Sequence, residues 1–256
     1  MRVVPARPRK QPAAPAGESE RLLRLLEDEG FGIARRSYAP REAIEEEDQA
    51  TSLHVLTSGT AFLLRSTPLS GEVALGLLKG GDAFGNLAFA GGIVRGALVR
   101  ALTACEVAKV PGPTLEATVR RNPLVATKLM TLQEARLTRY EEFVARIWSR
   151  KTLIRLAGTL LFLSEHFPER NSCGAGPVAI GVLLTHEDLA AMVVSSRESV
   201  GAAMVEMRRW GIVDVRDGIV TVQAPEKLRE ASMGRRDRTS SITPRRTSPV
   251  RTVVSP

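Results

Sequence analysis

Two short amphipathic stretches separated by a pair of serines constrain the fold more than any other part of the chain. Residues 185–210 read THEDLAAMVVSSRESVGAAMVEMRRW. Thr185 and Ser196 can each open a helix because their hydroxyls accept a free backbone N–H, and Glu187 and Asp188 follow Thr185 at the positive end of a helix dipole. The buried face of the second helix recurs every three or four residues and consists of Val200, Met204 and Met207. This pattern predicts two helices that meet at a tight turn.

A hairpin is predicted directly after the second helix. Residues 212–222, IVDVRDGIVTV, contain two apolar-rich runs separated by Asp217 and Gly218. Asp-Gly between strand-like runs indicates a hairpin, because both residues tolerate a positive φ. Two helices followed by a hairpin make a winged helix-turn-helix. The alternative is an ordinary helical hairpin whose charged face is simply solvated.

The start of the second helix exposes residues suited to the major groove of DNA. An arginine fork can bond both acceptors on a guanine edge, and a carboxylate can accept from cytosine N4. Glycine and alanine beside them keep the helix slim enough to enter the groove. The candidate DNA-contacting residues, including both helix caps and the turn, are Thr185, Ser195, Ser196, Arg197, Glu198, Ser199, Gly201 and Ala202.

The positive charge of the chain is concentrated at its two ends. Residues 1–17 hold four basic residues and no acid, and residues 231–256 hold six Arg against Asp237. The ends therefore sum to +9, whereas the whole chain carries +8, so the part between them is near −1. Small and polar residues dominate both ends, which predicts disordered basic tails over 1–18 and 231–256. These tails are either phosphate-binding arms or solvated ends, and the helix pair itself is not a basic patch.

Composition excludes several other classes of protein. The chain has 256 residues, enough for one large domain or two modest ones, and no apolar run approaches the ~20 residues of a membrane helix. Its N-terminal stretch lacks the apolar region of a secretory signal. Cys105, Cys173 and three histidines fit neither a disulfide framework nor a zinc or iron–sulfur site. The expectation is a cytoplasmic protein without a metal site, and no catalytic arrangement follows from residue spacing, so no enzyme is predicted.

The first half of the chain has the texture of a β domain. A short amphipathic helix is predicted over residues 19–29. From residue 31 to residue 115, short apolar runs alternate with Gly, Pro or charged turns. Such close spacing of strands and turns predicts an antiparallel sandwich or barrel.

A long helix is predicted over residues 124–150, followed by another apolar helix over residues 153–167. The long helix has one narrow apolar stripe, broken at Arg136, which is typical of a two-stranded coiled coil with a second copy. Packing of the same stripe onto the β domain is the alternative. The predicted dimer residues are Val125, Leu129, Leu132, Tyr140, Phe143 and Ile147.

In its order of β domain, long helix and winged helix-turn-helix, the chain resembles the cyclic-AMP receptor (CRP/FNR) superfamily of bacterial transcription regulators. The motifs that carry the resemblance are GDAFGNLAF (81–89), VRALTACEVAKV (99–110) and SSRESVGAAMVEMRRWGIV (195–213). The resemblance implies that Arg197 and Glu198 contact bases of a palindromic operator in double-stranded DNA. It also implies a homodimer and RNA polymerase as a partner. This chain departs from many members at Val194, where they have a turn glycine, and at Ala202, where some have a basic residue.

The same resemblance implies an effector pocket, and here the chain departs further. The family's Gly-Glu-Leu and Arg-Ser/Thr-Ala stand in this chain as Gly85, Asn86, Leu87 and then Arg95, Gly96, Ala97. Arg95 keeps the phosphate partner, whereas Asn86 loses the anionic acceptor for the sugar and Gly96 loses a hydroxyl. Each lost hydrogen bond costs ~1 to 3 kcal/mol, so cyclic AMP should bind weakly. Tyr140 is at the position that would meet the base, and the effector is a cyclic nucleotide, a cyclic dinucleotide or nothing.

The sequence therefore predicts an α+β protein. Its predicted parts are a cyclic-nucleotide-binding-like β-roll over 19–122, a dimerisation helix over 123–150 and a winged helix-turn-helix over 151–230. The predicted function is that of a homodimeric, sequence-specific DNA-binding transcription regulator with a degenerate pocket, independent of ligand or responsive to another effector. The alternative is a nucleotide-sensing signalling module whose C-terminal helices dock a protein partner. The surplus of acid in the helix pair keeps that alternative open.

Overall fold

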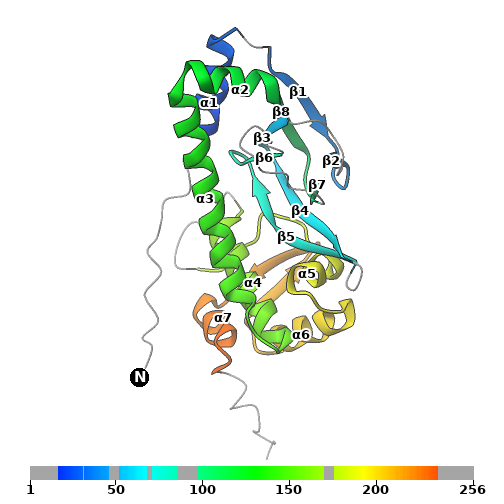
Figure 1. The fold of residues 1–256 in the computed structure, drawn as a ribbon. Helices are drawn as coiled ribbons and strands as arrows, with labels where there is room; N and C mark the ends of the chain where they lie inside the picture. The colour runs from blue at the N-terminus through cyan, green and yellow to red at the C-terminus, as the bar shows by residue number, and fades with distance from the viewer. Residues whose placement is uncertain are drawn as a thin grey trace, which may run out of the picture.

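The protein consists of a β-rich unit and a mainly helical unit, with one long helix running beside the first toward the second (Figure 1). The structure, a computed structural model, describes residues 17–30, 32–45, 52–67, 71–85, 97–169 and 176–235. No helix within these ranges is long and apolar enough to cross a membrane. The mixed architecture confirms the predicted α+β fold class.

The β-rich unit contains two four-stranded antiparallel sheets. Its strands are β1 (Ala34–Tyr38), β2 (Ala43–Glu45), β3 (Ser52–Ser58), β4 (Thr60–Thr67), β5 (Gly71–Lys79), β6 (Ala83–Gly85), β7 (Ala97–Ala101) and β8 (Cys105–Pro111). One sheet has the order β1-β8-β3-β6 and the other β2-β7-β4-β5. Leu56 and Phe84 of the first sheet share a buried cluster with Leu63 and Val99 of the second. The core of the unit therefore lies between the sheets, as in the expected sandwich or barrel.

Strand β4 is buried on both faces, which explains why residues 60–64, TAFLL, do not alternate between apolar and polar. Leu63 faces the core between the sheets. Phe62 and Leu64 belong instead to the core of the helical unit. A strand covered on both sides reads as a continuous apolar run. The outer face of this sheet is thus the surface on which the helical unit packs.

The long helix α3 (Pro123–Ile147) turns its apolar stripe inward, toward the β-rich unit and the short helices α1 (Gly17–Asp28) and α2 (Gly112–Arg121). Val125, Leu129 and Leu132 are buried in one cluster with residues of α1 and β3. Further along the helix, Phe143 and Ile147 pack into the core of the helical unit, and Tyr140 packs against the core between the sheets.

These contacts correct the predicted dimer interface. The stripe from Val125 to Ile147 is covered within the protomer, so its buried members cannot meet a second copy. Packing onto the β domain, the alternative reading of the same stripe, is what the structure contains. Periodicity shows that a helix has an apolar face but does not show what covers that face.

Arg136, which interrupts the stripe, anchors the helix to the β-rich unit. Its Nη1 donates to the carbonyl oxygen of Ala83 over 2.9 Å. Three residues later, Arg139 pairs with Asp82, and both side chains are buried. Asp82 also accepts from the backbone N–H of Lys79 over 2.9 Å, so the buried carboxylate is well hydrogen-bonded. Helix α3 ends at Ile147, short of the predicted Arg150.

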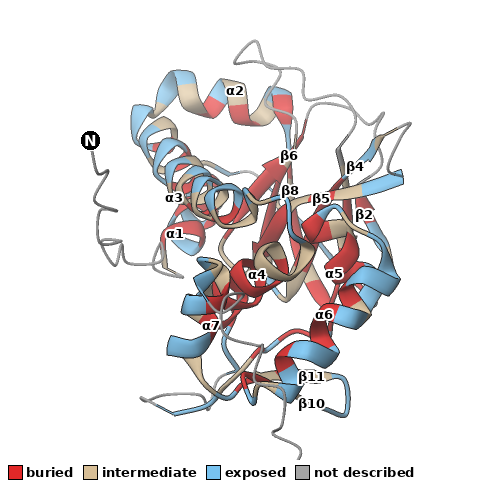
Figure 2. Ribbon diagram, turned by 90° about the horizontal axis from the view of Figure 1, so that it is seen from below, coloured by how far each residue is buried: buried red, intermediate tan, exposed pale blue. Residues whose placement is uncertain are grey.

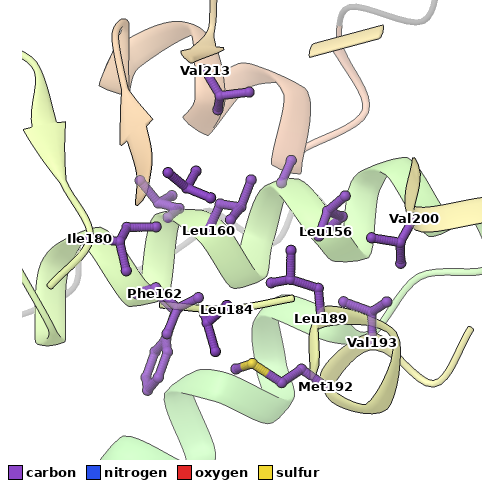
Figure 3. Packing of buried hydrophobic residues seen from close by; sticks show 14 of the residues in the cluster. Leu156, Leu160, Phe162, Ile180, Leu184, Leu189, Met192, Val193, Val200 and Val213 are labelled. Atoms are coloured by element: carbon purple, nitrogen blue, oxygen red, sulfur yellow. The ribbon is translucent and has the colours of Figure 1, made fainter. Parts of the chain in front are cut away.

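The helical unit is built around α4 (Thr152–His166), in which nine consecutive residues from Leu156 to Ser164 are buried. A helix that is apolar on all sides belongs in a core. The elements that follow are β9 (Val178–Ala179), α5 (His186–Val193), α6 (Arg197–Arg209), β10 (Val213–Arg216), β11 (Ile219–Val222) and α7 (Pro225–Ser232). Figure 3 shows side chains of α5, α6 and β10 gathered around Leu156 and Leu160 of α4.

The hairpin predicted at Asp217 and Gly218 is present. β10 pairs antiparallel with β11, and the two turn residues have φ values of 51° and 79°. β9 pairs with the other edge of β11 to complete a three-stranded sheet. The winged helix-turn-helix predicted from the sequence is therefore confirmed as a local fold.

The C-terminal boundary differs from the prediction. Helix α7 buries Leu228 and Ala231. A Cβ at Gly234 would lie 3.1 Å from the Ile154 side chain. A disordered tail starting at residue 231 is therefore wrong, because Ala231 is buried and Gly234 lies against α4. Gly17 and Glu18 likewise belong to α1, and the rest of both predicted tails, 1–16 and 236–256, lies outside the described residues.

Candidate nucleic-acid interface

Both helices of the helix-turn-helix begin with the caps expected from the sequence. Thr185 accepts the backbone N–H of Asp188 over 3.1 Å, and Asp188 accepts the backbone N–H of Thr185 over 2.8 Å. This reciprocal capping box satisfies two free donors at the start of α5. Ser196 accepts the backbone N–H of Ser199 over 3.1 Å at the start of α6. The cap hydrogen bonds therefore fix where each helix begins, and the Ser196 cap lies at the turn between them.

The first turn of α6 is open to solvent, whereas its inner face is buried. Arg197, Glu198 and Ser199 are exposed, and so is Ala202. The opposite face packs into the core through Val200, Ala203, Met204 and Met207. Viewed from below, buried residues lie toward α4 and exposed residues on the outer side of α6 and of the hairpin (Figure 2). The predicted DNA-contacting residues of α6 thus share one accessible face.

Two details of the start of α6 concern the Glu198 carboxylate and the contact of Gly201 with α5. Hydrogen bonds from its own backbone N–H and from the Ser196 hydroxyl lower the pKa of Glu198, so its carboxylate is an ionised acceptor at neutral pH. Gly201 lies under the His186 ring, where an added Cβ would be 3.6 Å from Nδ1. α5 and α6 therefore pack closely where α6 begins.

The turn between the helices contains a strained residue that the sequence flags. Val194 has φ 49° and ψ 62°, a left-handed conformation at which the helix α5 ends, and Ser195 donates its N–H to Ala190 over 3.1 Å. A β-branched side chain is a clear outlier in this region. Its side chain is 50% exposed, so little packing offsets the strain.

We expect Val194→Gly to stabilise the protein. The left-handed conformation costs an L residue ~1 to 2 kcal/mol, and glycine removes this cost. Glycine also makes the unfolded chain more flexible, which lowers the stabilisation by ~0.5 to 1 kcal/mol. The net increase in the free energy of unfolding should be ~0.5 to 1 kcal/mol, seen as a rise of ~2 °C in thermal unfolding. Val194→Ala keeps the Cβ and should give no such rise. A lower midpoint for Val194→Gly would show that the valine side chain stabilises the turn.

A basic cluster lies beyond the predicted interface, and sequence reasoning missed it. A groove of about 560 Å³ between the end of α6 and the hairpin is lined by Arg208, Arg209 and Arg216. Asp214 accepts from Arg216 over 2.8 Å and lies 3.9 Å from Arg208. Counting charges along the sequence obscured this cluster, because the count does not show that three of the four Arg of residues 182–217 line one groove. Three arginines beside a slim exposed helix provide phosphate partners.

The candidate effector pocket is described only at its edges. Gly85 ends β6 with φ 106°, and a Cβ there would lie 2.4 Å from the Ser52 carbonyl oxygen, so only glycine fits. Ala97 begins β7. The ring of Tyr140 stands 3.0 Å from the Cβ position of Gly76, and burial raises the pKa of its phenol to about 12. The remaining predicted pocket residues, Asn86, Leu87, Arg95 and Gly96, lie outside the described residues.

One cysteine and two histidines elsewhere in the described part make contacts within the fold. Cys105 is buried in β8, and burial raises the pKa of its thiol. His54 stacks on Phe84 with 5.2 Å between ring centroids. His166 Nε2 lies 2.8 Å from a Glu142 oxygen. Within the described ranges no group of three His, Cys, Asp or Glu side chains is placed to hold a metal ion.

Comparison with known protein families identifies both halves of the chain. Residues 35–122 match the model of the cyclic nucleotide-binding domain, and residues 154–231 match the model of the Crp-like helix-turn-helix domain. These segments correspond to the β-rich unit with α2 and to the helical unit around α4.

Individual relatives agree with this division. The cAMP-activated global transcriptional regulator CRP of Salmonella typhimurium is 27% identical over 180 residues, which cover 70% of this chain and 84% of that protein. The cyclic AMP receptor protein of Thermus thermophilus is 28% identical over 187 residues, covering 73% of this chain and 82% of that protein.

Solved structures show the same fold. A CRP-family transcriptional regulator of Thermus thermophilus has a TM-score of 0.65 at 20% identity, covering 77% of this chain and 96% of its own. The c-di-GMP-responsive global regulator CLP of Xanthomonas campestris has a TM-score of 0.65 at 22% identity, covering 82% of this chain and 99% of its own. Both domain models, the relatives and the shared fold lead to one conclusion: the chain belongs to the CRP/FNR superfamily of transcription regulators.

Proposed function

We propose that the protein is a homodimer that reads a palindromic DNA site by inserting α6 of each protomer into a major groove. The observation that carries the proposal is the exposed first turn of α6, where Arg197 and Glu198 follow the Ser196 cap. An arginine fork recognises guanine, and a carboxylate accepts from cytosine. The small residues Gly201 and Ala202 continue this face, so the helix can approach base edges closely.

The dimer contact is assigned to the outer face of α3 instead of its inward stripe. Met130, Leu137 and Val144 recur every seven residues and are 72%, 59% and 47% exposed. A seven-residue repeat keeps one seam facing a partner helix along a coiled coil. Trp148, directly after the helix, is 86% exposed and extends the same face. A line of exposed apolar side chains supports burial by a second copy of the chain.

A dimer also compensates for the charge of a single helical unit. Residues 182–217 hold four Arg against six acids, so one copy attracts phosphates weakly. Two copies held at the ~34 Å spacing of one DNA turn double both the base contacts and the phosphate contacts. RNA polymerase is the proposed protein partner of the bound dimer, on the strength of family membership alone.

The effector pocket is proposed to be degenerate. Asn86 and Gly96 replace a carboxylate and a hydroxyl of the cyclic-nucleotide pattern, which supports weak binding of cyclic AMP. The Salmonella relative is named as cAMP-activated, and the Xanthomonas structural neighbour as c-di-GMP-responsive. Both nucleotides are therefore ligands to test, beside DNA binding that needs no effector.

The function is tested by selecting duplexes from a random pool with the full chain, alone and with cyclic AMP or c-di-GMP. We expect enrichment of a palindrome whose half-site centres lie ~10 base pairs apart, without a requirement for cyclic AMP. Gel shifts on the selected site then measure affinity under each condition. If no sequence is enriched under any of the three conditions, the proposal is contradicted. That result would favour a module whose C-terminal helices dock a protein.

We expect deletion of residues 236–256 to weaken binding to all DNA sequences alike. This segment carries five Arg and one Asp, and it follows Arg235, the last described residue. Removing phosphate-neutralising charges lowers non-specific affinity and flattens the dependence of log K on log salt. Titrations of specific and random duplexes at several salt concentrations measure both effects. A loss confined to the selected site would show that the segment contributes to sequence recognition instead.

A further inference from the structure

A groove of about 1100 Å³ separates the outer edge of the β-rich unit from the start of the helix-turn-helix. It is lined on one side by Arg41, Glu72 and Arg100, and on the other by residues that include Asp188 and Arg197. One ion pair crosses it. Arg41 Nη1 donates to Asp188 Oδ1 over 2.6 Å, and Nη2 donates to Oδ2 over 2.7 Å. Two parallel hydrogen bonds fix both the distance and the angle between the groups.

Arg41 is held in place because the backbone of its turn is hydrogen-bonded to β7. Arg41 lies in the turn between β1 and β2 with a φ of 73°, a conformation that non-glycine residues seldom adopt. Its N–H donates to the carbonyl oxygen of Ala101 over 2.8 Å, and Ala101 donates to the carbonyl oxygen of Glu42 over 2.9 Å. These bonds tie the turn to the last residue of β7, the strand that begins at Ala97 beside the candidate effector pocket.

The aspartate is equally constrained. Asp188 is 8% exposed and is the third residue of α5. Its Oδ2 accepts from both the N–H and the hydroxyl of Thr185, each over 2.8 Å. The carboxylate that meets Arg41 is therefore the one that caps the first DNA-facing helix. Burial alone would raise the pKa of Asp188, but hydrogen bonds from Arg41 and Thr185 lower it, so the group is ionised at neutral pH.

Backbone strain is concentrated around the same groove. Three non-glycine residues in the described part have positive φ: Arg41, Val194 and Asp217. Asp217 is explained by its hairpin turn and Val194 by its place at the end of α5, whereas Arg41 lines this groove and makes the ion pair. Strained residues persist only where their surroundings determine them, and they cluster at sites with a function. The strained φ of Arg41 and its ion pair with Asp188 are independent observations on the same residue.

We propose that Arg41 and Asp188 form an interdomain latch that fixes the helix-turn-helix on the β-rich unit in an orientation ready for DNA. The latched arrangement leaves Arg197, Glu198 and Ser199 open to solvent. The inference that the latch aids DNA binding depends on the proposed function, whereas the latch itself does not. Because the turn is bonded to β7, displacement of that strand alters the position of the guanidinium.

The test compares full-chain Arg41→Gly, Arg41→Lys and Arg100→Gln with wild type. Arg41→Gly removes the guanidinium and relieves the strained φ, although glycine also frees the backbone of the turn. Arg41→Lys keeps the charge and loses the fork. Arg100 is the matched control, because it pairs through two hydrogen bonds of 2.7 and 2.5 Å with Glu72 of its own unit and lines the same groove.

Hydrogen exchange without DNA decides whether the latch exists. We expect Arg41→Gly to speed amide exchange over residues 185–194 by about fivefold, Arg41→Lys to have a smaller effect, and Arg100→Gln to match wild type. Exchange in Arg41→Gly equal to wild type, or equal acceleration in Arg100→Gln, would overturn the latch.

DNA affinity measured on the same samples decides whether the latch aids or opposes DNA binding. Arg41→Gly should weaken binding to the selected site by about fivefold, because the competent orientation becomes less populated. Unchanged or tighter binding would overturn the claim that the latched form is the one ready for DNA. If the wild-type protein binds no DNA, the proposed function fails. The exchange experiment still tests whether the latch exists, because it is done without DNA.

Discussion

Replacing Arg197 with alanine should remove discrimination at one base pair in each half-site of the operator. A bidentate arginine–guanine contact is worth ~1 to 3 kcal/mol, so two half-sites lose ~2 to 6 kcal/mol, or ~30-fold to ~20,000-fold in affinity for the selected palindrome. The side chain is exposed at the first residue of α6 and makes no contact with the core, so the fold should be unaffected. Gel shifts with the selected duplex and with duplexes mutated at each position measure the change.

Arg120→Ala serves as the matched control for charge. Arg120 is exposed on α2, at the opposite end of the molecule from α6, and pairs only with Glu116 of its own helix among the contacts seen (Figure 1). It removes the same charge and should leave both affinity and preference unchanged. An Arg197→Ala variant that binds the palindrome as tightly as wild type, with the same base preferences, would rule out direct readout by this residue.

Replacing Leu137 with aspartate should convert the proposed dimer to a monomer. Leu137 lies at the centre of the exposed seven-residue repeat, between Met130 and Val144. A dimer would bury this position beside its own symmetry copy, where two unpaired carboxylates are strongly unfavourable. DNA affinity should fall by ~100-fold or more, because each protomer then binds one half-site without the help of the other. Sedimentation at micromolar concentration and gel shifts measure the two effects.

Leu132→Ala separates the two faces of α3. Leu132 is buried against α1 and the β-rich unit, so its truncation should lower the free energy of unfolding by ~2 to 4 kcal/mol without changing the oligomeric state. Leu137→Asp should show the reverse pattern, with near-normal stability of the protomer and loss of the dimer. If Leu137→Asp remains dimeric, the outer face of α3 is not the contact.

Local patterns predicted the helix-turn-helix almost completely. Thr185 and Ser196 cap the helices because a hydroxyl beside free N–H groups is a local arrangement, set by residues three positions apart. The Asp217-Gly218 turn follows from the backbone freedom of those two residues, and the buried stripe of α6 follows from helical periodicity. Each of these features depends on neighbours in the chain, so no knowledge of the remaining fold was needed.

The partner of each side chain was not predictable in this way. Arg136 appeared to interrupt a stripe, yet it hydrogen-bonds to Ala83, which is distant in the sequence. Asp188 appeared only as a favourable charge at a helix start, and the structure adds a bidentate contact with Arg41 of the other unit. Arg208 and Arg209 of α6 meet Arg216 of the hairpin because α6 and the hairpin fold against each other.

The sequence by itself determined the helix-turn-helix with its hairpin, the order of the domains and the family, because capping, turn and periodicity signals act over a few residues and survive as motifs. It did not predict the short helices α2 and α7. Only the tertiary structure decided which face of α3 is covered, where the C-terminal tail begins and what meets Asp188. Those outcomes depend on contacts between segments up to 147 residues apart, and a one-dimensional pattern records that a surface is apolar or charged without recording its partner.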